Sequence, residues 1–520
     1  MRFLSALPSF LRRPVGLAEA RQLVQSRLED RAGAFLRLAE RAIYGQPASP
    51  YRALLAAAGC EYGDLVGLVQ REGLEATLRS LVGRGVYLTV DEFKGRRPAS
   101  RGAATVTAGP IALRNPDAAL RVPGRTSGSR GQGVPILFDL AFVRDCAVDY
   151  LLALHARGGR AWEKAIWEVP GGGALFRILK LAALGSPPVR WFSQVDPGDP
   201  GLHARYRWGA RALWWGGALA RVALPRPEHV PLDNPRPIAR WMEAALRAGR
   251  TPYLRSFPTS VVRVCQAAAA AGIDLEGAEF TMAGEPVTEA RLAVVRSVGG
   301  TARPRYGAIE TGPIGYGCLA PEAPDDVHVV SDLYAVVQAD GGADRTLAPG
   351  TLFLTGLCAT APFVLLNVSL GDQAVCVSRA CGCPLEALGW APHLHTIRSA
   401  EKLTGEGMTF LDADVVHLLE EMLPARFGGS PTDYQLVEEQ DSGGRTRLRL
   451  LVHPAIGPLN ADAVRQAFLE GLSAGSGPER VMGLVWRDSG LIEVERRPPL
   501  ATGSGKVLHL HVRPPARPLS

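Results

Sequence analysis

The chain is organised around residues 125–135, whose sequence is Arg125-Thr126-Ser127-Gly128-Ser129-Arg130-Gly131-Gln132-Gly133-Val134-Pro135. Glycines allow the backbone to curl until successive N–H groups point at one anion, an arrangement that suits phosphate. The hydroxyl side chains can add hydrogen-bond donors, and the arginines can neutralise negative charge. The spacing is not that of a Walker A loop, G-x-x-x-x-G-K-[ST]. Taken alone, the stretch fits either a phosphate-binding loop or an ordinary surface loop, because Ser and Gly mark loops generally.

The composition is that of a globular protein with more than one domain. A chain of 520 residues exceeds one hydrophobic core, so we expect two or three domains. Hydrophobic residues at 47% and charged residues at 21% argue against wholesale disorder. The net charge of +7 comes from arginines spread along the chain, without a dense basic block or a zinc-finger or RNA-binding signature. We therefore expect no nucleic-acid partner.

Neither apolar stretch of the first half fits a membrane or export signal. In residues 1–16, arginines follow the short apolar run, which is not the order in a signal peptide. Residues 206–224 hold three tryptophans among arginines, and these charges exclude a membrane-spanning helix. This segment is either an interfacial amphipathic helix or, as we prefer, a helix packed on its own domain. We expect a cytoplasmic protein without a transmembrane segment, whose eight cysteines are reduced thiols.

Hydrophobic periodicity divides the chain into three parts. Apolar residues at helical spacing predict helices across residues 17–82, and the run 86–90 predicts a strand. Helices then alternate with strands: we expect helices at 142–156, 236–248, 260–271 and 289–298, and strands at 165–169, 280–283 and 303–307. After residue 397, helices at 412–422 and 462–472 accompany paired strands at 435–439 and 447–453. We predict a helical N-terminal segment (1–105), a large α/β domain (106–397) and a small α+β domain (398–520).

Further motifs follow the Ser/Gly loop in a fixed order. They are Ala283-Gly284-Glu285-Pro286, Tyr306-Gly307-Ala308-Ile309-Glu310-Thr311-Gly312, Leu370-Gly371-Asp372 and Thr502-Gly503-Ser504-Gly505-Lys506. This series, spread over residues 110–510, resembles the adenylate-forming superfamily of acyl-CoA synthetases and luciferases. The nearest likeness is to the phenylacetate–CoA ligase branch, which includes acyl-protein synthetases. The resemblance implies a large adenylate-binding domain and a mobile C-terminal lid.

The resemblance implies that ATP and Mg²⁺ are bound and that a carboxylic acid attacks the α-phosphate. The β- and γ-phosphates would be wrapped by Thr126, Ser127, Gly128, Ser129 and Gly131, with Arg130 balancing their charge. Glu310 would hold Mg²⁺, a hard cation suited to a carboxylate and phosphate oxygens. Lys506 would reach from the lid to the α-phosphate as charge develops there. The expected catalytic residues are therefore Lys506, Glu310 and Arg130.

The nucleoside would lie on the remaining motifs. Gly284, Glu285 and Pro286, with Tyr306 and Gly307, would form the adenine slot, and the base would stack on the phenol ring. Asp372 would accept hydrogen bonds from the ribose hydroxyls. Small and apolar residues in the helices 236–248 and 260–271 suggest a pocket for an uncharged aryl or acyl body.

Several positions depart from the family pattern. Gln132 stands where the family carries lysine, the run 365–369 lacks the usual arginines, and the acidic hinge residue is displaced by one position to Glu401. CoA is our expected acceptor, and a carrier-protein phosphopantetheine, a protein cysteine and an amine remain alternatives. The rival function is a non-catalytic nucleotide- or acyl-binding protein.

The cysteines suggest a separate site. By resemblance to some members of this branch, Zn²⁺ would be held by Cys318, Cys381, Cys383 and either His328 or Cys376 in tetrahedral geometry. Buried free thiols are the alternative, because C-x-C is a poor match to a zinc knuckle. We expect His393 and His395 to be structural histidines. A nucleophile-based hydrolase is disfavoured, because the chain has no G-x-S-x-G elbow.

Overall fold

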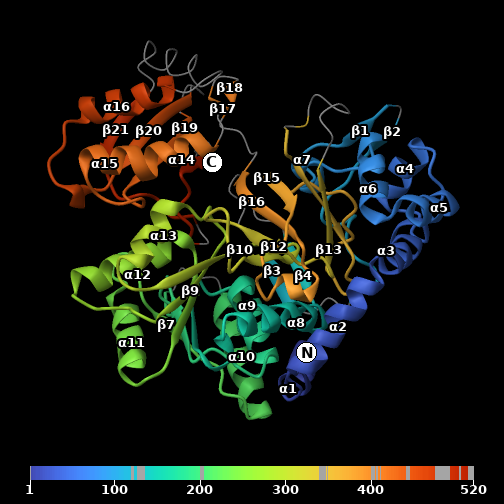
Figure 1. Ribbon diagram of the computed structural model, residues 1–520, viewed down its shortest axis with the longest axis horizontal. Helices are drawn as coiled ribbons and strands as arrows, with labels where there is room; N and C mark the ends of the chain where they lie inside the picture. Colours follow the sequence, from blue (N-terminus) through green and yellow to red (C-terminus); the bar gives the residue numbers. More distant parts are fainter. Residues whose placement is uncertain are drawn as a thin grey trace.

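The computed structural model describes residues 2–102, 104–118, 122–125, 135–199, 204–338, 347, 349–399, 404–405, 408–409, 412–440, 446–474, 492–502 and 505–512. Figure 1 shows N-terminal helices along one side, a central sheet between two layers of helices, and a separate C-terminal unit. The predicted fold class is confirmed: a large α/β domain follows a helical segment and precedes a small α+β unit.

The N-terminal segment is helical, as predicted. Its helices are α1 (Arg2–Leu11), α2 (Leu17–Glu29), α3 (Arg31–Ala39), η1 (Glu40–Tyr44), α4 (Pro50–Ala57), α5 (Tyr62–Glu72), α6 (Leu74–Gly83) and α7 (Val90–Phe93), followed by the hairpin β1 (Ala99–Arg101) and β2 (Ala104–Val106). The predicted strand at 86–90 is wrong, since Leu88 makes only an isolated bridge to Val368. Thr89 instead caps α7 in a capping box with Glu92.

The large domain is built on a ten-stranded mixed sheet. Its order is β15 (Asp372–Ser378), β16 (Pro392–Ser399), β12 (Val327–Val329), β11 (Gly312–Gly317), β10 (Thr301–Ala308), β9 (Glu279–Ala283), β8 (Pro252–Ser256), β5 (Glu163–Trp167), β6 (Arg190–Ser193) and β7 (Pro227–His229). From β10 through β7 neighbouring strands are parallel, and from β10 to β15 they are antiparallel. The short hairpins β3 (Val122–Arg125)–β4 (Pro135–Phe138) and β13 (Tyr334–Gln338)–β14 (Leu352–Gly356) lie outside this sheet.

Alternating side chains of the parallel strands bury both faces of the sheet. Ile166, Trp191 and Tyr253 share a core with α8 (Leu140–Ala156) and α9 (Gly172–Ala183). Trp167 and Leu254, one residue along their strands, share another core with α11 (Arg236–Arg247), α12 (Pro258–Ala270) and α13 (Glu289–Arg296). This period of two is what a sheet covered on both faces requires.

The helix α10 (Ala204–Ala220) covers the segment singled out for its tryptophans. It packs against α1 and α9, as expected of a helix that belongs to its own domain. Three of its apolar side chains, Trp208, Trp215 and Leu219, are nonetheless exposed. Among the described residues, no helix combines the length and apolarity needed to cross a bilayer.

The C-terminal unit has its own sheet and its own core. Its sheet order is β21 (Ile492–Arg496), β20 (Thr446–Val452), β19 (Tyr434–Gln440) and β22 (Leu510–Val512), and its helices are α14 (Asp412–His417), η4 (Leu418–Met422), α15 (Leu423–Phe427) and α16 (Ala461–Ala474). The predicted pairing of the strands near 435 and 447 is confirmed. A small ladder, β17 (Thr404–Gly405)–β18 (Met408–Thr409), precedes this unit, and the short 3-10 helix η5 (Pro454–Ile456) lies within it. Two more short 3-10 helices, η2 (Gly159–Ala161) and η3 (Glu386–Leu388), belong to the large domain.

The N-terminal segment is joined to the large domain by Asn367. This residue is fully buried and has a positive φ of 48°. Its side-chain amide donates to the carbonyls of Leu78 and Val86, at 3.0 and 3.1 Å. Its own backbone carbonyl accepts from the N–H of Leu88 at 3.0 Å. Asparagine suits this place because it tolerates the left-handed region and supplies two donors.

We expect Asn367→Ala to lower the free energy of unfolding by about 2–4 kcal/mol, because buried carbonyls lose their donors and alanine is strained at positive φ. Chemical denaturation would measure the loss. The exposed Asn234→Ala is the control and should shift stability by less than about 0.5 kcal/mol. A variant at Asn367 as stable as this control would contradict the role of the amide.

Candidate functional site

The predicted site residues cluster where the parallel strands end. Gly284 follows β9, and Tyr306 lies near the end of β10, the neighbouring strand. In a parallel sheet these ends lie on the same edge, which is where α/β proteins place ligands. The loop that carries Lys506 is inserted at this edge from the C-terminal unit, which we call the lid.

Gly284 provides the space for Lys506. Its φ is +92°, and a Cβ there would lie 3.2 Å from the Phe257 ring and 3.3 Å from Cε of Lys506. Glycine is therefore required both by the backbone and by the approach of the lysine. The Lys506 ammonium lies 5.7 Å from the centre of the Phe257 ring.

The Lys506 side chain is partly buried, and three of the predicted acids lie close enough to act on its charge. Burial lowers the pKa of Lys506, while the carboxylates of Glu285, Glu310 and Asp372 act in the opposite direction. The structure thus brings together Glu285, Glu310, Asp372 and Lys506, which come from four separate sequence motifs. A cation in this setting is available to a developing negative charge.

The carboxylate of Glu285 has a role that the sequence did not indicate. It accepts hydrogen bonds from the backbone N–H of Thr259 at 2.9 Å and from the hydroxyl of the same residue. Arg291 approaches it to 3.3 Å, and the backbone N–H of Val507 donates to its other oxygen at 2.9 Å. Glu285 therefore positions the residue next to Lys506.

Glu310 lies in the tight turn between β10 and β11. A Cβ at Gly307 would lie 2.2 Å from the carbonyl oxygen of Gly312, so the turn depends on glycine at 307. The N–H of Ala308 donates to the Thr311 hydroxyl at 3.2 Å and closes the turn. Glu310 is 8% exposed, and burial raises its pKa, against the opposing charges of Lys94 and Lys506. A bound cation would favour the ionised carboxylate, which fits a role in holding Mg²⁺.

Tyr306 of β10 and Asp372 of β15 form a pair, although three strands separate β10 from β15 in the order of the sheet. The Tyr306 hydroxyl donates to Oδ2 of Asp372 at 2.7 Å. Burial and the adjacent carboxylate raise the pKa of the tyrosine, so the phenol stays protonated. The hydrogen bond fixes the Tyr306 ring against Asp372.

The predicted phosphate loop lies outside the described residues. This holds for Thr126, Ser127, Gly128, Ser129, Arg130 and Gly131, and for the hinge candidate Glu401. The flanking strands β3 and β4 pair in antiparallel register, and β3 packs against α9.

A buried polar network joins the lid to the large domain. Glu420 of η4 accepts a hydrogen bond from the Thr288 hydroxyl and lies 2.7 Å from Nε of Arg291 at the start of α13. His509, which precedes β22, also contacts Glu420. Burial alone would raise the pKa of Glu420, but Arg291, His509 and Thr288 together lower it to about 2. We call these four residues the latch. No sequence motif indicated them, because they meet only where the lid contacts the large domain.

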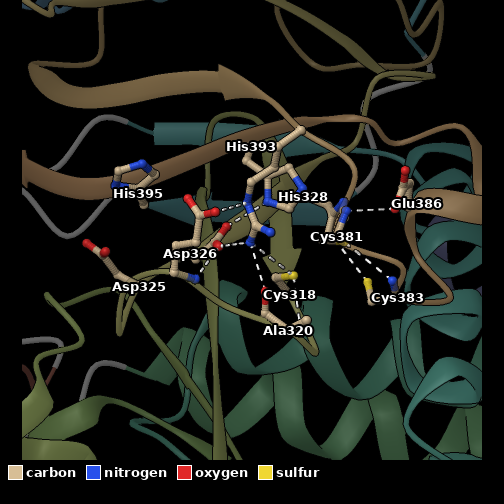
Figure 2. A network of polar contacts seen from close by, with 12 residues as sticks. Cys318, Ala320, Asp325, Asp326, His328, Cys381, Cys383, Glu386, His393 and His395 are labelled. Carbon is tan, nitrogen blue, oxygen red and sulfur yellow. Dashed lines mark hydrogen bonds and ion pairs between the residues drawn. The ribbon is translucent and has the colours of Figure 1, made fainter.

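A second cluster lies at the antiparallel side of the sheet, as Figure 2 shows. Ligand atoms of Cys318, His328, Cys381 and His393 all lie within 4.8 Å of one another. Cys383 is close as well, its Sγ 3.1 Å from Nε2 of His328. Cys376 and His395 are not members, and His395 lies apart in Figure 2.

Both histidines of this cluster are oriented by their Nδ1 atoms. The Nδ1 of His328 lies 2.6 Å from the carbonyl oxygen of Trp390, and that of His393 lies 2.8 Å from Asp326. The buried Nε2 of His393 has no hydrogen-bond partner among the described residues. Burial lowers the pKa of His328 to about 4, so its imidazole is neutral near pH 7. An imidazole whose Nδ1 is fixed by an oxygen and whose Nε2 faces other possible ligand atoms is typical of a metal site.

The thiols are surrounded by N–H donors. The N–H of Ala320 donates to Cys318 at 3.3 Å, and the N–H of Cys383 donates to Cys381 at 3.4 Å. Glu386 holds the 381–383 turn by accepting from two backbone N–H groups. All eight cysteines are free of disulfides. Such donors stabilise thiolate charge, so the residues present fit a zinc ion.

Comparisons with known proteins found likeness in structure only. No family model matches the chain. No curated protein matches it. Among solved structures, it is similar to a 2-hydroxyisobutyryl-CoA ligase bound to its acyl-AMP and CoA, at 14% identity and TM-score 0.46 over 96% of this chain and 91% of that one.

Two other solved structures are similar to the chain at comparably low identity. The anthranilate CoA ligase AuaEII, bound to anthranoyl-AMP, is 12% identical with TM-score 0.44, covering 78% of this chain and 67% of that one. The amide bond synthetase McbA from Marinactinospora thermotolerans is 14% identical with TM-score 0.41, covering 95% and 98%. These identities and TM-scores are too low to assign a function, so the function is inferred from the geometry of the site.

We expect Glu420→Gln to loosen the lid, because losing one charge of a buried ion pair costs about 3–5 kcal/mol. Hydrogen exchange of the Val507 N–H should accelerate by about 100-fold or more. In the wild type, protection of the Val507 N–H from exchange should also fall as the pH drops from 4.5 toward 2. The reason is that the docked lid favours the ionised carboxylate of Glu420, which is protonated over this range. The control is Glu421→Gln, an exposed neighbour paired with His417, which should exchange like wild type. Unchanged protection in Glu420→Gln would rule out the latch.

Proposed function

We propose that this protein is an ATP- and Mg²⁺-dependent ligase that converts a carboxylic acid to an acyl-adenylate and then passes the acyl group to a thiol. The observation that carries the proposal is the insertion of Lys506 among Glu285, Glu310 and Asp372, at the edge where the parallel strands end. A lysine held there by a separate lid suits a reaction that gathers negative charge.

The first step brings anions together. A carboxylate oxygen of the acid attacks the α-phosphorus of ATP, and the bond to pyrophosphate breaks. Lys506 would meet the charge that develops on the α-phosphate, and Glu310 would hold Mg²⁺ against the phosphate oxygens. Asp372, fixed by Tyr306, would accept from the ribose hydroxyls. The residues present therefore supply both charge balance and orientation.

The second step needs the lid to move. A thiolate attacks the acyl carbon and AMP leaves, so the acceptor must reach a centre that Lys506 covers in this structure. CoA is the acceptor we propose, with a carrier-protein phosphopantetheine or an amine as alternatives. The rival function, a non-catalytic nucleotide- or acyl-binding protein, predicts ATP binding without pyrophosphate release.

The Cys/His cluster supports a separate proposal, a structural zinc ion. Cys318, His328, Cys381 and His393 would hold it, with Cys383 close enough to replace one thiolate. This differs from the set expected from the sequence by including His393, which Asp326 orients. The ion would tie the segment after β11 to the turn before η3 and so stabilise the edge of the sheet.

We expect Lys506→Ala to lower the rate of pyrophosphate release by about 100-fold or more, because the lost charge acts mainly on the transition state. The rate is measured with hydroxylamine as acyl trap across a panel of acids. ATP binding, measured by calorimetry, should stay close to wild type. The control is Arg426→Gln, which changes an exposed residue of the lid and should keep full activity. Undiminished turnover in Lys506→Ala would refute the assignment.

Elemental analysis should find about one zinc ion per chain, and a chelator should lower Tm by several degrees. Cys381→Ser and His393→Gln should each lose the metal. Cys376→Ser is the matched control, because this cysteine lies on β15 outside the cluster. Metal-free protein with a Tm insensitive to chelator would leave the cluster as buried thiols and histidines.

A further inference from the structure

Four cationic side chains face one another beneath the strand ends. They are Arg177 and Lys180 on α9, Arg255 on β8 and Arg305 on β10. Lys180 is 1% exposed, Arg255 2% and Arg305 8%. The side chain of Arg177 is the most open, at 23%. Shared partners place them close together: Glu168 pairs with both Arg177 and Arg255. Lys180 and Arg305 lie over the rings of Tyr150 and Tyr316, which stack at 5.8 Å.

The acids nearby do not balance these charges. Glu168, just after β5, pairs with both Arg177 and Arg255, the latter at 2.6 Å. Within the described part of the chain, neither Lys180 nor Arg305 has a carboxylate within ion-pair distance; each lies instead against a tyrosine ring. Asp149 is already paired with Arg27, at 3.8 Å.

Donors also remain unused in this cluster. The Nε atoms of Arg255 and Arg305 are buried and have no hydrogen-bond acceptor among the described residues. Burying cations without counter-charge is costly, by several kcal/mol for each ion even after relaxation. An anion bound within the cluster would balance this excess of positive charge.

The cluster adjoins the Lys506 site. Arg177 is one of the charges that act on Lys506, second among the cations and acids only to Glu285. A Cβ on Gly173, at the start of α9, would lie 2.9 Å from the Arg177 guanidinium and 3.9 Å from Ile309, the neighbour of Glu310. Arg177 therefore links the cluster to the turn that carries Glu310.

We propose that the acid activated by this protein carries a second anionic group, which binds among Lys180, Arg255 and Arg305 while the reacting carboxylate meets Lys506. This inference rests on the proposed function. A substrate with a second anionic group replaces the uncharged aryl or acyl group expected from the helices 236–248 and 260–271. These helices, α11 and α12, cover the opposite face of the sheet from the cationic cluster. The ring of Tyr150, stacked on Tyr316 at 5.8 Å with its hydroxyl 2.5 Å from that of Tyr253, provides a flat wall beside the cations.

The test compares acids that differ only in the charge at the far end. Glutaric, adipic and terephthalic acids are offered beside their monoamides, which keep the size and remove the second charge, and beside phosphonocarboxylic acids of equal length. Pyrophosphate release with hydroxylamine gives kcat/KM for each. We expect the dianionic acids to be preferred by about 10- to 100-fold, the range of a charge-assisted hydrogen bond. The phosphonate arm shows whether the second group is a carboxylate or a phosphate.

Arg305→Met and Lys180→Met should remove that preference by lowering kcat/KM for the dianionic acids toward that of the monoamides. Arg303→Met, two residues earlier on the same face of β10, is the matched control and should keep the preference. Circular dichroism and Tm establish that each variant folds. For any that does not, calorimetric binding of terephthalate and its monoamide to the wild-type protein decides instead.

The outcomes separate this inference from the function on which it rests. If uncharged-ended acids turn over as well as dianionic ones, or Arg305→Met keeps the preference, the anionic subsite is refuted and the ligase stands. If no acid releases pyrophosphate but dianions bind and monoamides do not, the subsite stands and the ligase falls. If no acid turns over and dianions do not bind selectively, both the anionic subsite and the ligase are refuted.

Discussion

The candidate site depends on one buried carboxylate, that of Glu285. It stands at the end of β9 and accepts hydrogen bonds from α12, through Thr259, and from the lid, through the N–H of Val507. The large-domain cation Arg291 balances its charge. Since Val507 follows Lys506 directly, the position of the lysine relative to the strand ends is fixed by this acceptor. A neutral side chain would provide the shape but not the charge-assisted bonds that hold a loop from another domain.

Charge then divides the site into two ends. Around Lys506 the neighbours are mostly acids, Glu285, Glu310 and Asp372, which keep a cation in place and suit a metal ion. Beneath α9 the neighbours are mostly cations, and Glu168 is the one acid among the described residues that pairs with them. Arg177 lies where these ends meet. An extended anion with its reacting carboxylate at one end and a second charge at the other would complement both, with each end specifying its orientation.

The sequence predicted the order of elements well because local patterns decide them. Alternation and helical spacing predicted β9, α13, β10 and the lid helices, and the Tyr306–Gly312 motif and Lys506 do lie near one another. Local chemistry misled at 86–90, where the Thr89 cap starts a helix. It also missed α9, because Gly171, Gly172 and Gly173 look like a loop although two of them begin the helix.

What the sequence could not predict are partners that are distant in the chain. Neither Glu168 nor Arg305 belongs to a motif, and their meeting requires the register of the parallel strands. Likewise His393 becomes a candidate ligand only because β16 pairs with β12, opposite His328. The zinc set expected from the sequence was Cys318, Cys381, Cys383 and either His328 or Cys376, and the sheet places His393 beside His328 as a further candidate. Long-range pairing therefore determined the chemistry of both clusters.

The latch suits a lid that must open during the reaction. An apolar interface would lose its full hydrophobic free energy on opening, about 25 cal/mol for each Å² exposed, with little compensation. Glu420, Arg291 and His509 instead gain hydration when they separate, which offsets much of the lost ion pairing. Such an interface is specific when closed, since any misplacement leaves a buried charge unpaired, and yet opens at modest net cost. The two half-reactions that we propose, with different groups acting on one adenylate, would require that combination.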